Sequence, residues 1–555
     1  MMVDQTNRQA ADIKQFEGQN MLLGFQRHVV SKIGAALLAG TVLTASPAVA
    51  FPVFKQAVAE AAAHNSSVAA YYRSVQYDAV WTAETEISRE RRKALIRALA
   101  NSDEHGLPAA RYDVDALVGQ MAAARSRRDL GLVEVAMTQI YLKYARDLTS
   151  GMLVPSKIDD GLVRKIAYRD KQELMDSFVA SQDPNGFMQG LAPQTPEYLR
   201  LKKERLRLEG LIASGGWGAQ VPSGKYEPGD SGASVTMLRD RLIALGFMQR
   251  SSSASYDRTM EKAVQAFQIA HGLEADGVSG KGTIEEINRS PEHRLKSVMV
   301  AMERERWLDR SIEGREILVN LADFTAKIFD DGKLTFRTRS VVGKNQSDRR
   351  SPEFSDTMEH MVINPTWNVP RSIATKEYLP MLQNNPNAVG YLRLVNARGQ
   401  TVDRSEVDFS QFSTRNFPFD MKQAPGNRNA LGLVKFMFPN KHNIYLHDTP
   451  QKALFARETR AYSHGCIRLQ QPFDFAYALL AKQEENPKEF FHSRLKTGRE
   501  TRVDLEVNIP VHIIYRTAYT EAKGPVQYRR DVYGRDAKIW KALANEGVAL
   551  PGQQG

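Results

Sequence analysis

The spacing of apolar residues changes along the chain, from helical before residue 308 to strand-like from Glu316 onward. In residues 132–145, apolar side chains recur three and four positions apart, as on the core-facing side of a helix. After Glu316, short apolar runs alternate with turns rich in Gly and Pro, a pattern typical of a β-sandwich or a partly open barrel. A chain of 555 residues is also too long for one hydrophobic core. The sequence therefore predicts an α+β protein of several domains.

Loop-rich segments, such as the Gly- and Pro-rich stretch at 215–229, divide the chain into predicted parts. The long stretch between strands at about 372–432 predicts a subdomain, because loops of that length are usually functional. The predicted parts are a signal peptide (residues 1–50), an all-α scaffold domain (51–225), a three-helix module (226–290), a helix returning to the scaffold (291–312), a mixed β-sandwich-like domain (313–520) with a capping subdomain (about 372–432), and a C-terminal extension (521–555).

Within the β-rich domain, apolar runs and turn residues predict individual strands. A tight hairpin turn is expected at 330–333, where two Asp and a Gly precede Lys333. The expected strands are 317–321, 325–329, 358–364, 433–438, 443–446, 503–507 and 511–515.

The first fifty residues predict export. An apolar stretch at 33–45 follows basic residues and leads to an A-x-A pattern at 48–50, the layout of a secretory signal peptide. The stretch is shorter than the roughly 20 residues that span a bilayer as a helix. We therefore expect a periplasmic protein that begins near Phe51 and has no stable membrane insertion after cleavage. An uncleaved N-terminal anchor is the alternative.

The formal net charge of +11 favours anionic surroundings such as DNA, anionic lipid or an acidic wall polymer. Lys and Arg are spread along the chain without a long basic run, which argues against a nucleic-acid partner. The eleven histidines show no H-E-x-x-H or comparable ligand cluster, so we expect no metal site.

The single cysteine, Cys466, excludes an intramolecular disulfide and a Cys-rich zinc site. A lone cysteine is most often a small buried apolar residue, so a catalytic role needs support from its neighbours. A nucleophilic thiol needs a base or a cation beside it at neutral pH. His447 ends a predicted strand and can lie opposite Cys466 as a general base, whereas His464 is close enough for local positioning.

Two neighbours of Cys466 add to the predicted site. Gly465 permits a tight turn and leaves the Cys466 amide free as an oxyanion donor. Arg468 carries a planar fork of donors that suits a carboxylate or a phosphate.

The order His447-Asp448, then Ser463-His464-Gly465-Cys466 and Arg468 resembles the signature of the L,D-transpeptidase (YkuD-type) family. The resemblance implies that Cys466 is the nucleophile, that His447 is its base and that the backbone carbonyl of Asp448 orients the imidazole. It further implies catalytic-site positions for His464 and Gly465, and substrate-binding positions for Ser463, Arg468, Trp367 and Asn368. A core position is the alternative for Trp367.

The resemblance extends over roughly residues 90 to 540. Residues 229–290 resemble the peptidoglycan-binding module of many cell-wall enzymes, and the arrangement as a whole resembles the large multidomain branch of the family. The segment at 427–429 departs from the pattern, being slightly longer and more basic.

The implied reaction is acyl transfer without a cofactor. Cys466 would attack the third residue of a tetrapeptide stem, release D-alanine and form a thioester, which the amine of a second stem's diaminopimelate would attack to give a 3→3 cross-link. Carbapenems would acylate the same cysteine. The alternatives are an L,D-carboxypeptidase, a transferase that anchors an envelope protein to peptidoglycan, and a non-catalytic wall-binding protein.

Overall fold

The structure, a computed structural model, describes residues 52–308 and 313–551. The predicted signal peptide lies outside these residues, as does the expected start near Phe51. Among the helices in the described part of the chain, none is both long and apolar enough to cross a membrane.

The N-terminal part is helical and packs around the longest helix, α5 (Arg127–Ser150). A capping box formed by Ser126 and Asp129 starts this helix. The buried carboxylate of Glu134 accepts the backbone N–H groups of Val80 and Thr82, in the loop before α3 (Glu86–Ala100), at 2.7 and 2.8 Å. The other helices of this part are α1 (Val53–Ala62), α2 (Ser66–Ser74), α4 (Val114–Ala123), α6 (Lys171–Ala180), α7 (Pro184–Gly190) and α8 (Pro196–Ala213).

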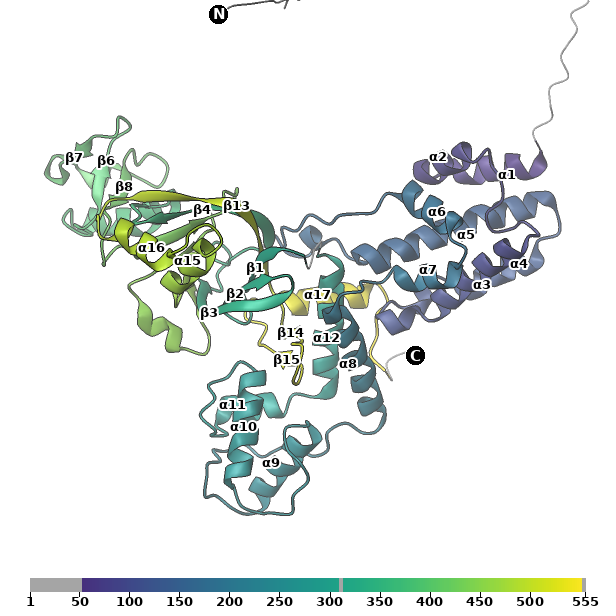
Figure 1. Cartoon of the computed structure of the whole chain (residues 1–555), viewed down its shortest axis with the longest axis horizontal. Coiled ribbons are helices and arrows are strands. Elements are labelled where there is room, and N and C mark those ends of the chain that lie inside the picture. The colour runs from purple at the N-terminus through teal and green to yellow at the C-terminus, as the bar shows by residue number, and fades with distance from the viewer. Residues whose placement is uncertain (1–51, 309–312, 552–555) are drawn as a thin grey trace, which may run out of the picture. The chain divides into compact units, whose positions relative to one another are not determined.

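Three further helices form a small module with a hydrophobic core of its own. They are α9 (Ala233–Ala244), α10 (Arg258–Ala270) and α11 (Lys281–Ile287). The core side chains include Leu238, Leu242 and Phe267, all fully buried. Helix α12 (Pro291–Arg306) follows and lies along α8 (Figure 1).

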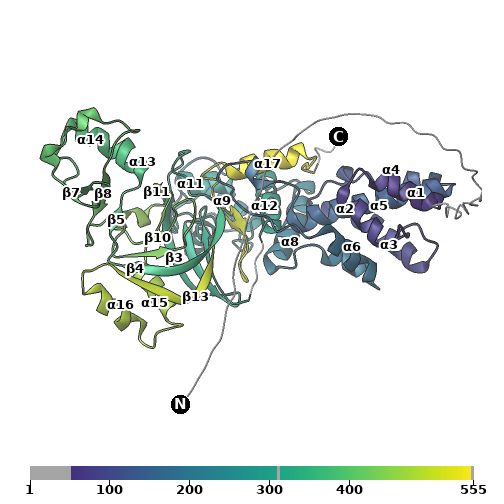
Figure 2. The ribbon, with the colours of Figure 1, turned by 90° about the horizontal axis from the view of Figure 1, so that it is seen from above.

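The C-terminal half is built on a nine-stranded mixed sheet, so the predicted α+β class is confirmed. The strand order is β11-β3-β12-β10-β9-β4-β13-β1-β2, and β2 also pairs with β3. This extra pairing closes the ring of strands between β3 and β2. Helices α15 (Pro472–Leu480) and α16 (Pro487–Leu495) cover one face (Figure 2). The strands are β1 (Arg315–Asn320), β2 (Thr325–Asp330), β3 (Lys333–Gly343), β4 (Phe354–Ile363), β9 (Val434–Met437), β10 (Leu446–His447), β11 (Ala461–Ser463), β12 (Ile467–Leu469) and β13 (Thr501–Ile514).

Three of the expected strands differ in detail from the structure. The strands expected at 503–507 and 511–515 are one strand, β13, whose register against β4 shifts between Asp504 and Ile509. A bulge accommodates the residues between these two positions, and pairing with β4 continues from Ile509 and Pro510 onward. The strand expected at 443–446 begins only at Leu446, the first residue of β10. The residues before it form a turn, because the side-chain oxygen of Asn440 accepts the backbone N–H groups of residues 442 and 444.

The capping subdomain has a separate four-stranded sheet and core. Its sheet starts at Trp367, a few residues before the predicted position. Its elements are β5 (Trp367–Asn368), α13 (Arg371–Ile373), the π-helix η4 (Ala374–Tyr378), α14 (Leu379–Asn384), β6 (Arg393–Val395), β7 (Thr401–Val402) and β8 (Asp420–Gln423).

The segment predicted as an extension is packed into the fold. It contains β15 (Gln527–Tyr528), which pairs with β14 (Ala518–Tyr519), and α17 (Arg535–Asn545). Arg535 is fully buried and pairs at 3.1 Å with Glu353, the residue just before β4.

Candidate active site

Two short neighbouring strands bring Cys466 and His447 to one cavity. Cys466 directly precedes β12, and His447 is the last residue of β10. The two strands are parallel, with His447 opposite Arg468. All three side chains line a cavity of about 260 Å³. Their proximity follows from strand pairing, since the three are up to 21 residues apart in sequence.

The turn before Cys466 is held by its own polar groups. Gly465 has φ of +120°, in the region that favours glycine. Its N–H donates to the hydroxyl of Ser463 at 3.1 Å, and that hydroxyl donates to the carbonyl of Cys466 at 2.5 Å. Ser351 donates to the carbonyl of Gly465 at 2.6 Å. No acceptor within the described residues takes the N–H of Cys466, which leaves this amide free to bind a ligand oxygen.

The thiol of Cys466 is neutral in this arrangement. Although the residue is partly exposed, its sulfur is surrounded by protein, and burial raises the pKa of the thiol to about 11. The backbone and the hydroxyl of Tyr445, together with the charge of Arg468, act against that rise in pKa. The thiol donates to the carbonyl of Asn443 at 3.4 Å.

The imidazole of His447 is also neutral, and its tautomer is set by the backbone. Nδ1 lies 2.5 Å from the carbonyl oxygen of Asp448. Because a carbonyl only accepts, Nδ1 carries the proton and Nε2 carries the lone pair of the neutral ring. Burial and the neighbouring guanidinium of Arg468 lower the pKa of His447 to about 3. The backbone carbonyl of Leu431 also lies against the imidazole and, like that of Asp448, acts to raise its pKa.

The side chain of Asp448 fixes the position of its carbonyl. Its carboxylate accepts the N–H of Leu433 at 2.9 Å and that of Thr449 at 2.7 Å, and it pairs with Lys452 at 2.6 Å. A Cβ at Gly432 would lie 2.3 Å from this carboxylate, so only glycine leaves room for it.

Arg468 presents an incompletely satisfied guanidinium to the cavity. Its Nη1 donates to Gln451 at 2.6 Å, whereas its buried Nε has no partner among the described residues. Such a group suits a carboxylate of a ligand.

The other predicted substrate-binding residues have different surroundings. Trp367 lines the cavity and is 7% exposed, edge-on to Tyr378 at 6.3 Å between ring centroids, so it is also part of the capping core. Asn368 is exposed and does not line the cavity, because successive side chains of β5 point to opposite faces. Ser463 lines it, but its hydroxyl is already used to hold the turn.

His464 faces the capping subdomain. Its Nε2 lies 2.8 Å from the carboxylate of Glu377 in η4, and Arg349 pairs with the same oxygen at 2.8 Å. No sequence pattern connected Glu377 with the cysteine motif. Tyr445 was also missed, although its position two residues before His447 places both on the same side of an extended segment. Within residues 52–308 and 313–551, no cluster of three His, Cys, Asp or Glu side chains could hold a metal ion.

Comparison with family models gives three matches along the chain. Residues 314–503 match the L,D-transpeptidase catalytic domain. Residues 66–204 match a scaffold domain, and residues 231–287 match a "Putative peptidoglycan binding domain". The resemblance seen in the cysteine motif and in the three-helix module is thereby confirmed.

Similar proteins include a Haemophilus influenzae protein named "Putative L,D-transpeptidase", 33% identical over 232 residues, or 41% of this chain. The alignment covers 46% of that relative, so the chain spans about half of its length. A crystal structure of an L,D-transpeptidase from Xylanimonas cellulosilytica is 14% identical in sequence, with a TM-score of 0.17. The match covers 54% of this chain and 98% of that chain. One from Stackebrandtia nassauensis is also 14% identical, with 53% and 96% covered and a TM-score of 0.22.

Proposed function

We propose that the chain is a peptidoglycan L,D-transpeptidase that acts through a thioester on Cys466. The observation that carries this proposal is the cavity shared by Cys466, His447 and Arg468 within the L,D-transpeptidase catalytic domain. A thiol, a neutral imidazole whose Nδ1 is protonated and an unoccupied backbone amide are the groups that cofactor-free acyl transfer requires.

In the first step, Sγ of Cys466 attacks the carbonyl carbon of the third residue in a tetrapeptide stem. The sulfur–carbon bond forms as the thiol proton passes to Nε2 of His447. The peptide C–N bond then breaks, and the imidazolium returns this proton to the leaving amine of D-alanine. The free N–H of Cys466 would stabilise the oxyanion, and Arg468 would bind a carboxylate of the stem.

In the second step, the side-chain amine of a diaminopimelate residue in another stem attacks the thioester. The new C–N bond forms, the C–S bond breaks, and the amine proton returns to sulfur through His447. The product is a 3→3 cross-link. The peptidoglycan-binding module and the net charge of +11 support an acidic wall polymer as substrate. Because that polymer lies outside the cytoplasm, we infer an exported, periplasmic enzyme.

The test is incubation with a disaccharide-tetrapeptide, followed by mass spectrometry of the protein and the products. The parent protein should form a covalent adduct at Cys466 and a cross-linked dimer, and Cys466→Ala should form neither. His447→Ala should acylate about 100-fold more slowly, the usual scale of a lost general base. His293→Ala, which removes an exposed histidine on α12, is the matched control and should behave like the parent.

The products separate the alternatives. Tripeptide without dimer would indicate an L,D-carboxypeptidase, and transfer only to a protein amine would indicate an anchoring enzyme. An adduct in the Cys466→Ala variant, or none in the parent, would rule out the thioester mechanism.

A further inference from the structure

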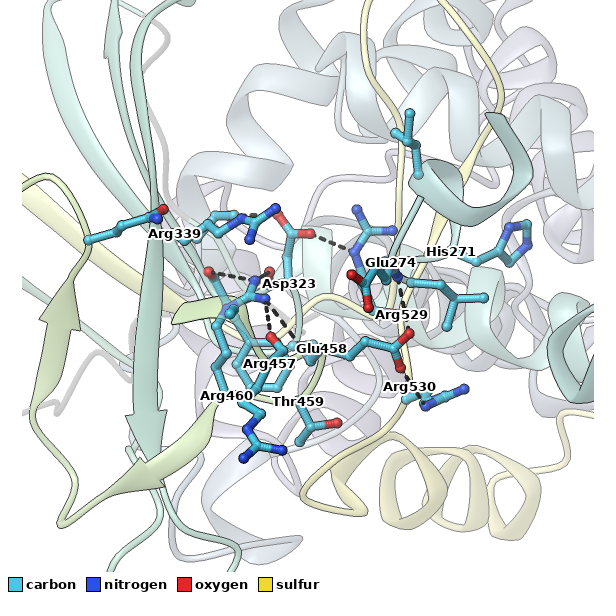
Figure 3. Close-up of a pocket in the computed structure, with 18 of the residues that line it drawn as sticks. His271, Glu274, Asp323, Arg339, Arg457, Glu458, Thr459, Arg460, Arg529 and Arg530 are labelled. Carbon is cyan, nitrogen blue, oxygen red and sulfur yellow. Dashed lines mark hydrogen bonds and ion pairs between the residues drawn. The ribbon is translucent and has the colours of Figure 1, made fainter. Parts of the chain in front are cut away.

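A second cavity, of about 480 Å³, lies between the three-helix module and the closed sheet (Figure 3). The module supplies residues 271–275 after α10. The catalytic domain supplies 322–325, 456–460 and 470–471, and the C-terminal segment supplies 529–530. Neither Cys466 nor His447 lines it, so it is separate from the candidate active site.

Direct contacts between the three segments hold the walls of this cavity in place. Arg529 donates to the carbonyl of Ala270 at 2.8 Å and pairs with the buried carboxylate of Asp323 at 2.5 Å. The N–H of Glu274 in the module donates to the carboxylate of Glu458 at 3.1 Å. The module therefore contacts the catalytic domain directly through Glu274 and Glu458, and indirectly through Arg529.

Positive charge exceeds negative charge in the lining. The charged lining residues are Arg337, Arg339, Arg457, Arg460, Arg529 and Arg530 against Glu274, Asp323 and Glu458. Within the described residues, Arg339 donates only to the carbonyl of Phe455, and the donors of Arg460 all go to backbone carbonyls. Burial and the charge of Arg339 lower the pKa of Arg460 to about 10, which still leaves it charged at neutral pH. These guanidinium groups lack a carboxylate partner of their own.

The arrangement of the charges favours a particular kind of ligand. Arg339 and Arg460 lie on the sheet side, whereas Glu274 lies on the module side (Figure 3). Guanidinium forks bind carboxylates bidentately, and the carboxylate of Glu274 opposite them favours a positive group and disfavours a uniform polyanion. A short peptide that carries several carboxylates and a free amine satisfies both sides.

The cavity is also connected to the active site by a single strand. Cys466 directly precedes β12, and Gln470, which lines the second cavity, directly follows it. Four residues of extended chain span about 13 Å at about 3.3 Å per residue. A peptide in the second cavity would therefore lie near, but outside, the reacting centre.

We propose that this cavity is a second binding site for a peptide bearing several carboxylates and a free amine, the chemistry of an unreacted peptidoglycan stem. The choice of peptide rests on the proposed function, whereas the anion site rests on the arginines themselves. The site would hold the wall polymer between module and catalytic domain, and so raise the local concentration of stems at Cys466.

The test uses the full chain and a disaccharide-tetrapeptide that carries a photoactivatable diazirine, with adducts mapped by mass spectrometry. Adducts are expected in two places, at 271–275 or 456–460 in the second cavity and around Cys466. The double variant R339Q/R457Q removes two exposed charges with little change in packing. Labelling of the second cavity should fall about tenfold, the effect of losing two partly exposed ion contacts. Labelling around Cys466 should stay within about twofold of the parent.

The matched control is R127Q/R169Q, which makes the same change in charge at two exposed arginines of the helical scaffold. It should leave both sets of adducts unchanged. A probe with amidated carboxylates should label only weakly in the second cavity.

Three other outcomes would contradict the second site, its ligand or the proposed function. No adducts at 271–275 or 456–460, or equal labelling in R339Q/R457Q, would overturn the second site. Inorganic polyphosphate displacing the probe better than unlabelled tetrapeptide would assign the site to a phosphate polymer instead. Labelling of the second cavity without any adduct near Cys466 would reject the proposed function and leave the anion site standing.

Discussion

The resting state of Cys466 and His447 is a neutral pair. Burial raises the pKa of the thiol to about 11 and lowers that of the imidazole to about 3, so neither group is charged at pH 7. A stable thiolate–imidazolium pair would require the opposite shifts. For the acyl transfer proposed above, the proton must therefore leave the sulfur during the attack, and Nε2 of His447 carries the lone pair that would receive it.

This state predicts how alkylation of Cys466 by iodoacetamide depends on pH. Only the thiolate reacts, and because the folded pKa is raised, its fraction should grow about tenfold per pH unit from pH 7 to pH 10. The rate is followed by intact mass, which is unambiguous because the chain has one cysteine. The urea-unfolded chain is the control, and its rate should level off above about pH 8.5. A rate that is already constant between pH 6 and 8 in the folded protein would show a preformed ion pair.

Spacing and residue type were enough to predict which chemistry the motif could offer, since Cys466, His447 and Arg468 do line one cavity. Tyr445 and Glu377 could not be assigned in the same way. Tyr445 acts on the sulfur only through the turn that Asn440 imposes, and Glu377 reaches His464 across 87 residues of sequence.

At the scale of elements, one carboxylate connects the capping subdomain to the cysteine motif. Glu377 in η4 pairs with His464, two residues before Cys466, and with Arg349. Lys376 adds a more exposed pair with Asp348 at 3.2 Å. These contacts hold η4 over the cavity that contains Cys466, since Glu377 and His464 both line it.

Replacing this carboxylate should loosen the capping subdomain. In Glu377→Gln, the amide keeps the volume but loses both charge-assisted contacts, so local opening should become about tenfold more frequent. Hydrogen exchange of the backbone amides at 374–378 measures this opening. Glu406→Gln, at an exposed carboxylate of the same subdomain, is the control and should have no effect. Unchanged exchange in Glu377→Gln would show that the apolar core alone holds η4 in place.

Most of the strands with an apolar run were predicted, including the four-residue β9 within the expected 433–438, whereas β3 was indicated only by the hairpin turn before it. The hairpin of β2 and β3 follows directly from its turn at Asp331 and Gly332. Strands β11 and β12 have three residues each and carry no recognisable period. Their strand character comes from pairing with β3, a contact between distant segments.

At the scale of the molecule, a buried ionic cluster joins segments that are far apart in sequence. Glu353, only 1% exposed, pairs with Arg304 of α12 at 2.7 Å and with Arg535 of α17 at 3.1 Å. Arg304 pairs also with Asp536 at 2.9 Å. Neither periodicity nor motif spacing could indicate this cluster, because its members interact only after the helices and the sheet have come together.

Glu353→Gln should therefore destabilise the fold rather than the chemistry. Removing one partner from a buried ionic network costs up to about 3–5 kcal/mol. Here, among the carboxylates of the described residues, Arg304 would keep only Asp536, and Arg535 would keep only the longer contact with Asp159, so the cluster would carry excess positive charge. The midpoint of urea unfolding should fall, and the amides of α17 should exchange faster than those of α10, which belongs to the separate core of the three-helix module.

Glu485→Gln, at an exposed carboxylate, is the matched control and should leave the midpoint unchanged. Alkylation of Cys466 in the absence of urea should keep the parent rate and pH profile, because Glu353 does not line the active-site cavity. An unfolding midpoint equal to that of the parent would mean that apolar packing, not this cluster, fixes α12 and α17 against the sheet.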